Sequence, residues 1–224
     1  MLIWDGKAYT NTMTGGKIFV EAVATSGWRI NGPQTVFFRQ VNCEQDPSNS
    51  VDDNGTPTYI FNSGATIWAF GLKSERELTT ITTRNGGKTE VLSGLQYPAR
   101  EVSSTAPLFI VENASASFSY GTESFWIGGD YQIQVRETRG GLTREFRSSL
   151  SSYPVKALPR NNGSMVPLFS AIASASVTNG TYRLINKYSA KALDVSFAPL
   201  RMTHERMRIR SRTTIECSDK RHSF

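Results

Sequence analysis

The chain has 224 residues, of which 38% are hydrophobic and 11% aromatic, a composition typical of a globular protein with a substantial core. Its net charge of +6 is concentrated at one end, because residues 197–224 hold seven Lys and Arg against three Asp and Glu. The rest of the chain is nearly neutral, and no apolar run is long enough to span a bilayer, so neither a nucleic-acid nor a membrane partner is expected.

The start of the chain and its reactive residues exclude several classes of protein. The first ten residues, MLIWDGKAYT, lack the charged and apolar regions of a signal peptide. Only two cysteines occur, Cys43 and Cys217, which allow at most one disulfide. Both histidines, His204 and His222, lie near the C-terminus, which argues against a Ser-His-Asp or Cys-His catalytic site and against a zinc site. No metal or other cofactor is expected.

Short runs of β-branched and aromatic residues, separated by Gly, Thr, Ser and Asn, predict an all-β fold before residue 197. Five similar runs begin at Lys17, Thr35, Thr66, Lys88 and Pro107. Spacings of this size are typical of the coils of a parallel β-solenoid, and the longest step contains a polar loop, DPSNSVDDNGTPT. The predicted core ladders comprise Phe19, Val23, Phe37, Val41, Trp68, Phe70, Val91, Leu95, Phe109 and Val111.

The segment YQIQVRETRGGLTREFR, from Tyr131 to Arg147, predicts a β-hairpin with a two-residue turn at Gly140-Gly141. Cross-strand pairs of opposite charge contribute about 0.2–1 kcal/mol each and explain the charged residues without assigning them a catalytic role. The predicted pairs are Arg139 with Leu142, Glu137 with Arg144, Arg136 with Glu145, and Val135 with Phe146.

The composition divides the chain into four parts. Residues 1–147 form the predicted coils and terminal hairpin, and residues 148–179, rich in Ser, Ala and Pro, predict a linker. A new β pattern occupies residues 180–196. Residues 197–224 form a basic tail without a sustained pattern, which we expect to be disordered or out of frame.

Two resemblances to known families follow from these stretches. GGKIFVEAV, WRINGPQTVFFRQVNCE, TIWAFGLKSE, NGGKTEVLSGLQYP and GGDYQIQVRETRGG together resemble the C-terminal coils of right-handed parallel β-helix proteins of the pectate-lyase-like superfamily. That resemblance covers residues 1–147 and implies a secreted, extracellular, carbohydrate-active bacterial protein. NGTYRLINKYSAKALDVS, residues 179–196, is similar to the opening of a ricin-type β-trefoil lectin module, which implies that Asp194 accepts hydrogen bonds from sugar hydroxyls.

The lectin segment departs from its family after residue 196. No Trp follows Trp126, the Gln-x-Trp core signature is absent, and only 45 residues remain from Gly180 where a trefoil needs three lobes. We therefore expect an incomplete β-trefoil segment, with no detectable sugar binding through Asp194. The whole chain is interpreted as a remnant of a longer protein.

Paired carboxylates are the remaining candidates for catalysis, since glycosidases use two. Glu21, Glu44, Asp46 and Glu75 lie near the ends of neighbouring predicted coils. The β-helix resemblance implies that Lys73 and Arg39 could neutralise bound uronates. The alternative is that these charges only keep the outer surface soluble.

The resulting functional hypothesis is a fragment of a secreted polysaccharide-degrading β-helix protein, a glycoside hydrolase or lyase, with a carbohydrate-binding module. We expect the chain to be monomeric, to have a polysaccharide or other glycan as its partner, and to lack a complete active site. The alternative is a non-enzymatic glycan-binding scaffold of the adhesin or tail-spike type, and the sequence leaves open whether the chain is an enzyme.

Overall fold

The computed structural model describes residues 9–11, 13–44, 51–123, 130–148, 153–155, 163–171, 182–185 and 192–195. The chain divides into two units, Met1–Ala175 and Ser176–Phe224. All regular elements in the described ranges are β-strands, which confirms the all-β prediction. Those ranges contain no helix that could cross a membrane.

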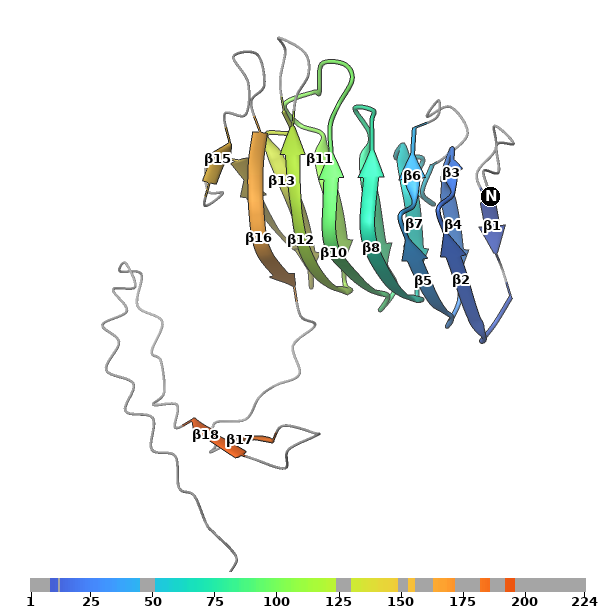
Figure 1. The fold of residues 1–224 in the computed structure, drawn as a ribbon, viewed down its shortest axis with the longest axis vertical. Coiled ribbons are helices and arrows are strands. Elements are labelled where there is room, and N and C mark those ends of the chain that lie inside the picture. Colours follow the sequence, from blue (N-terminus) through green and yellow to red (C-terminus); the bar gives the residue numbers. More distant parts are fainter. Residues whose placement is uncertain are drawn as a thin grey trace, which may run out of the picture. The chain divides into compact units, whose positions relative to one another are not determined.

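Two sheets form the first unit (Figure 1). Sheet A comprises, in spatial order, β1 (Tyr9–Asn11), β4 (Trp28–Asn31), β7 (Thr58–Ser63), β9 (Thr79–Arg84), β11 (Pro107–Glu112), β13 (Ile133–Arg139) and β14 (Leu142–Arg147). Sheet B comprises β2 (Lys17–Glu21), β5 (Thr35–Arg39), β8 (Thr66–Ser74), β10 (Lys88–Gln96), β12 (Ser115–Glu123), β16 (Gly163–Ala171) and β15 (Tyr153–Val155). The short strands β3 (Ala24–Thr25) and β6 (Asn42–Cys43) pair with each other, and β6 also pairs with the end of β8.

The chain winds back and forth between the two sheets. The successive pairs β4–β5, β7–β8, β9–β10 and β11–β12 each place one strand in sheet A and the next in sheet B, and strands of neighbouring coils pair in parallel. This winding of parallel strands is compatible with a β-helix-like fold. At one end the pairing becomes antiparallel, with β14 beside β13 and β16 beside β12.

Left-handed backbone conformations recur at the same places in successive coils. Between a sheet A strand and the next sheet B strand, the residues with positive φ are Gly15, Gly16, Gly32, Gly64, Asn85, Gly86 and Asn113. Glycine and asparagine enter this region at the lowest cost, which explains why they separate the strand runs in the sequence. A second series consists of Ala22 and Gln40, directly after β2 and β5, and of Gly71 and Ser93, in the middle of β8 and β10.

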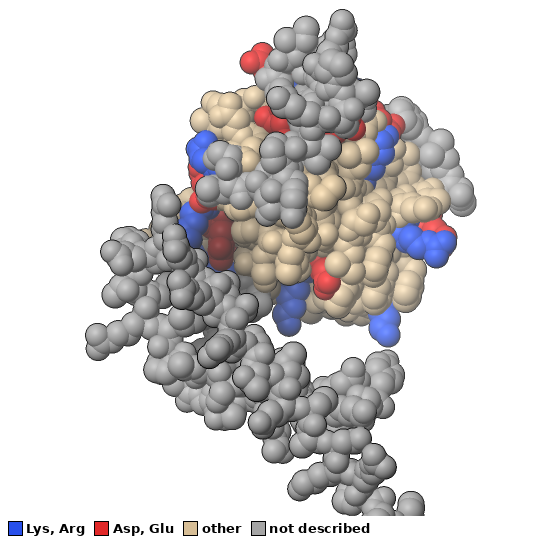
Figure 2. Space-filling view, turned by 60° about the vertical axis from the view of Figure 1, so that its left-hand side comes forward, with Lys and Arg blue, Asp and Glu red and all other residues tan. Residues whose placement is uncertain are grey.

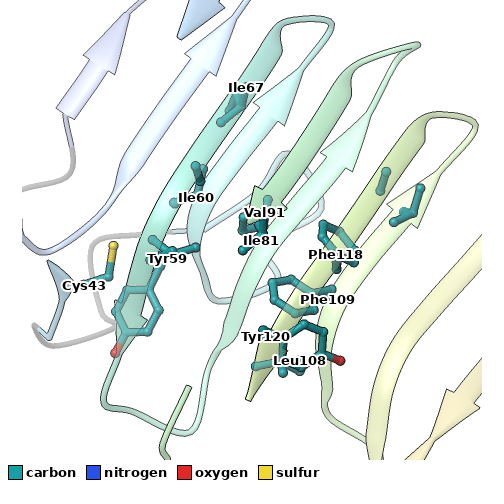
Figure 3. Close-up of a cluster of buried hydrophobic side chains, with 14 of the residues drawn as sticks. Cys43, Tyr59, Ile60, Ile67, Ile81, Val91, Leu108, Phe109, Phe118 and Tyr120 are labelled. Carbon is teal, nitrogen blue, oxygen red and sulfur yellow. The ribbon is translucent and has the colours of Figure 1, made fainter. Parts of the chain in front are cut away.

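The core lies between the sheets and consists of rows of side chains in register. One row in sheet A contains Trp28, Ile60, Ile81, Phe109 and Val135, all buried. A facing row in sheet B contains Phe38, Ala69, Val91 and Phe118. The rings of Phe109 and Phe118 stack with centroids 4.2 Å apart and thereby join the two sheets (Figure 3).

Buried polar side chains make hydrogen bonds at the corners. The side-chain amide of Asn62, fully buried at the end of β7, donates to the carbonyls of Ala65 and Lys88 and to Oγ1 of Thr89, while its Oδ1 accepts from the Ala65 N–H. Gly87 is required beside it, because a Cβ there would lie 3.0 Å from Oδ1 of Asn62 and 2.9 Å from a backbone carbonyl. Asn62 therefore joins the turn between β7 and β8 to the start of β10 in the next coil.

The predicted polar loop is anchored to the coils where it is described. Asp52 is buried, and its Oδ1 accepts from the N–H groups of Asn54 and Thr56 at 2.8 and 2.9 Å. Its other oxygen lies 3.0 Å from the guanidinium of Arg84 on β9. Residues 51–57 thus form a turn fixed to the outside of sheet A.

The positions of the repeated runs are largely confirmed. Lys17, Thr35, Thr66 and Lys88 begin β2, β5, β8 and β10, and they stand in one register row. Pro107 begins β11 in sheet A, so its place as the next step of that series was wrong. The next position in the row is Ser115.

The predicted core is confirmed for Val41, Val91, Phe109 and Val111, which are fully buried, and Val23 packs against the core. The predicted core was wrong for the residues whose side chains point outward from sheet B. Their inward neighbours occupy the core instead, since side chains alternate along a strand. Phe19, Phe70 and Leu95 are exposed by 73%, 45% and 40%, and Phe37 and Trp68 are only partly buried.

The hairpin register is confirmed at every predicted pair. Arg136 binds Glu145 across the strands at 2.9 Å, whereas Glu137 binds Arg139 of its own strand rather than Arg144. Residues 148–179, expected to form a linker, contribute β15 and β16 to sheet B.

In the second unit the described residues form an antiparallel pair, β17 (Tyr182–Ile185) and β18 (Ala192–Val195). A complete trefoil is not described, and residues 197–224 lie outside the described residues.

Candidate functional site

The outer face of sheet B carries a row of side chains that crosses six strands. Register pairing places Phe19 of β2 beside Phe37 of β5, and Phe37 beside Trp68 of β8. The outer row then continues through three polar residues, Glu90, Ser117 and Ser170, on β10, β12 and β16. Aromatic rings therefore form one half of the outer row and polar side chains form the other half.

The aromatic half forms an exposed apolar surface. The rings of Phe19 and Phe37 are stacked, with centroids 4.9 Å apart and planes 8° apart. Phe70 lies on the same face and is 45% exposed. An apolar cluster of this kind on the outside of a protein usually marks a surface that binds something.

A groove of about 350 Å³ lies where the aromatic half meets the polar half. Trp68, Lys88 and Glu90 line it on β8 and β10. On the strands beyond, the outward side chains at the groove are the small residues Ser115, Ser117 and Ser170, while Ala116 and Ala171, which also border it, belong to the buried core. Its volume lies within the range of small-ligand sites.

The groove offers an indole ring, hydroxyl groups, one ammonium and one carboxylate. Neither Lys88 nor Glu90 forms an ion pair with any described residue, so both remain available to a ligand. Trp68 makes no ring contact within the described part of the chain, which leaves its indole uncovered by another aromatic ring. Figure 2 shows that acidic and basic side chains form small separate groups on a largely uncharged surface.

Two of the predicted catalytic carboxylates lie close together at the C-terminal end of β8. The Nζ of Lys73 binds a carboxylate oxygen of both Glu44 and Glu75, and it lies 5.1 Å from the centre of the Tyr97 ring. Partial burial would raise the pKa of Glu44, but hydrogen bonds from Lys73 and Asn42 outweigh it and hold that pKa below its ordinary value. Burial alone would lower the pKa of Lys73, but its hydrogen bonds to the two carboxylates outweigh burial and raise that pKa above its ordinary value.

The other predicted site residues are placed separately. Glu21 forms an ion pair with Arg39 on the outer face of sheet B, away from the Lys73 cluster. Asp46 lies outside the described residues. Asp194 lies in β18, opposite Arg183 of β17 in the backbone register, and its contact with sugar stays a prediction.

The described residues contain no group of three or more side chains suited to hold a metal ion. Searches against protein families, curated proteins and solved structures each find no match.

Sequence reasoning missed Lys88, Glu90, Ser117 and Ser170. Lys88 begins β10, and Glu90 and Ser117 each stand two residues after the start of their strand, so the parallel register was a signal that could have placed Glu90 and Ser117 side by side, with Lys88 close to them. Ser170 reaches the groove through the antiparallel pairing of β16 with β12, which no local residue pattern indicates.

Proposed function

We propose that the outer face of sheet B binds a glycan. The observation that carries this proposal is the outer row, in which Trp68 stands directly beside a groove lined by hydroxyl groups and one carboxylate. A sugar ring has apolar C–H faces and a rim of hydroxyls. The electron-rich face of an indole attracts the C–H faces, and the polar side chains hydrogen-bond to the hydroxyls.

The charges favour binding over catalysis at the predicted carboxylates. Glu44, Glu75 and Glu21 are each held by a cation of the same chain. A glycosidase needs one carboxyl group that is protonated and a second that is free to attack or to activate water. The glycan-binding scaffold is therefore the better-supported of the two functions considered from the sequence.

The wider setting belongs to the same proposal. The strand winding is compatible with a right-handed parallel β-helix of the pectate-lyase-like type. A secreted, extracellular location would bring the glycan-binding face into contact with polysaccharide, and β17 and β18 would be the beginning of a ricin-type lectin segment. A monomer with one such face would be sufficient.

The test is a binding assay with Trp68→Ala. Isothermal titration with soluble xylan, cello-oligosaccharides and polygalacturonate, together with pull-down on insoluble cellulose, should identify at least one ligand of the intact chain. Trp68→Ala should weaken its binding at least tenfold, since stacking on the indole is lost. Leu142→Ala is the matched control, because it removes another exposed apolar side chain, 70% exposed, from the hairpin in sheet A. Equal affinities of Trp68→Ala and the intact chain, or no binding to any of these glycans, would contradict the proposal.

A further inference from the structure

We infer that Glu90 selects neutral polysaccharides over polysaccharides of uronic acids. This inference rests on the proposed function and names the class of glycan that the groove accepts. Glu90 would act through direct contact with the sugar beside Trp68, as a residue that determines specificity.

Glu90 has a central position in the groove. It lies between Trp68 of β8 and Ser117 of β12 in the outer row, and it is partly buried. Among the residues that line the groove, the only other charged one is Lys88. Lys88 stands two positions earlier on β10, in the row of Thr66 and Ser115.

The spacing of the strands fixes the distance between the stacked sugar and the carboxylate. Neighbouring strands lie about 4.8 Å apart, so a ring on Trp68 has its edge beside the Glu90 carboxylate. A neutral sugar offers adjacent hydroxyls there, and both can donate to a carboxylate. A hydrogen bond to a charged group of this kind corresponds to about tenfold or more in affinity.

A uronic acid would instead bring a second negative charge to the same place. Two like charges about 5 Å apart at a partly buried site repel each other strongly enough to lower affinity by about tenfold or more. Lys88 offsets this only in part, because two residues along a strand separate it from Glu90 by about 6.6 Å. The nearest other cation on this face, Arg39, is already paired with Glu21.

The outer row also sets the length of ligand needed for a test. From β8 to β16 it crosses three strand spacings, about 14 Å, which accommodates about three sugar units. Probes longer than three units therefore fill the groove, and a neutral and an acidic probe of equal length differ mainly in charge.

The experiment compares cellohexaose and hexagalacturonate by isothermal titration against the full chain and its variants. We expect the intact chain to bind the neutral probe at least tenfold more tightly. Glu90→Gln should lower the affinity for cellohexaose and bring the ratio of the two affinities close to one. Glu101→Gln is the matched control, because it removes the same charge from an exposed position in the loop between β10 and β11, and it should leave the ratio unchanged.

Ionic strength supplies a second readout. Added salt should strengthen binding of hexagalacturonate to the intact chain, because it screens the repulsion, but not to Glu90→Gln. Two results would overturn this inference and leave the proposed function standing, provided that Trp68→Ala abolishes binding. The first is that the intact chain binds hexagalacturonate as tightly as cellohexaose. The second is that Glu90→Gln leaves the ratio of the two affinities unchanged. If Trp68→Ala binds both probes as well as the intact chain does, the proposed function and this inference both fail.

Discussion

Phe37 and Phe38 are adjacent in β5, and they provide the sharpest test of which side chains hold the fold together. Phe38 is 1% exposed, faces sheet A and meets Trp28 at a centroid distance of 4.9 Å. Phe37 points outward and contacts Phe19. Truncating each residue to Ala removes the same atoms from opposite faces of one strand.

The two truncations should differ several-fold in their effect on the free energy of unfolding. Replacing a buried Phe by Ala costs about 3–5 kcal/mol. The contact between the rings of Phe38 and Trp28 contributes about 0.5–1.5 kcal/mol of that loss. We therefore expect Phe38→Ala to lower the free energy of unfolding by about 4 kcal/mol. Phe37→Ala loses one stacking partner on a surface that water already reaches, and we expect about 1 kcal/mol.

Urea unfolding followed by tryptophan fluorescence measures both values. Thermal unfolding should agree, with a fall in Tm of roughly 8–16 °C for Phe38→Ala, given about 2–4 °C per kcal/mol for a domain of this size. Equal losses, or a larger loss for Phe37→Ala, would mean that β5 is shifted by one residue, since such a slip exchanges the two faces. The outer row and the groove would then be wrong as well.

Three further results are expected from the buried polar groups. Asn62→Ala should lower the free energy of unfolding by about 3 kcal/mol in urea, because several buried backbone groups lose their partner, and a loss below 1 kcal/mol would contradict the corner hydrogen bonds. The pKa of Glu44 is lowered and that of Lys73 is raised. Stability from this cluster should therefore be full between the ordinary pKa values of the two groups, and fall as pH drops below that of Glu44 or rises above that of Lys73. Urea titrations of Glu44→Gln should lack the acid loss and show a smaller alkaline loss, because Glu75 still binds Lys73, and unchanged pH profiles would refute this. Burial raises the pKa of the Cys43 thiol to about 12, so in a Cys217→Ser background it should react with a disulfide reagent at pH 8 only after urea is added, and rapid reaction of the folded chain would show that Cys43 is accessible.

The sequence was sufficient to predict the elements whose determinants are local. The hairpin from Ile133 to Arg147 depends on a Gly-Gly turn and on pairs of opposite charge, and both can be read directly from adjacent residues. The starts of β2, β5, β8 and β10 follow from repeated turn residues. Those signals lie within a few residues of the structure that they specify.

The assignment of faces could not be made locally. In β5 both Phe37 and Phe38 are large and apolar, and in β8 Trp68 stands between Ile67 and Ala69. Alternation of polar and apolar residues therefore did not distinguish the inner side from the outer. Choosing the larger aromatic residues for the core placed them on the wrong side, because in β8 the smaller Ala69 is the one that fits opposite sheet A.

The candidate site was harder to predict because its shape depends on distant segments. The groove needs small residues on β16, which enters sheet B antiparallel to β12 from a stretch whose composition predicted a linker. The carboxylates Glu44 and Glu75 were predicted to be near each other, and they are, but composition did not show that Lys73 lies between them.

The stacking of coils has a consequence for how such a protein can change over generations. Among the described strands, those of each inner coil pair with the strands of the coils on either side, as β10 does with β8 and β12. Duplication or loss of one repeat, such as the 22 residues 66–87, would alter the span of the outer face by one strand spacing, about 4.8 Å, and keep the other rows in order. The length of the outer face can thus change by whole strand spacings, while the side chains of the remaining coils stay the same.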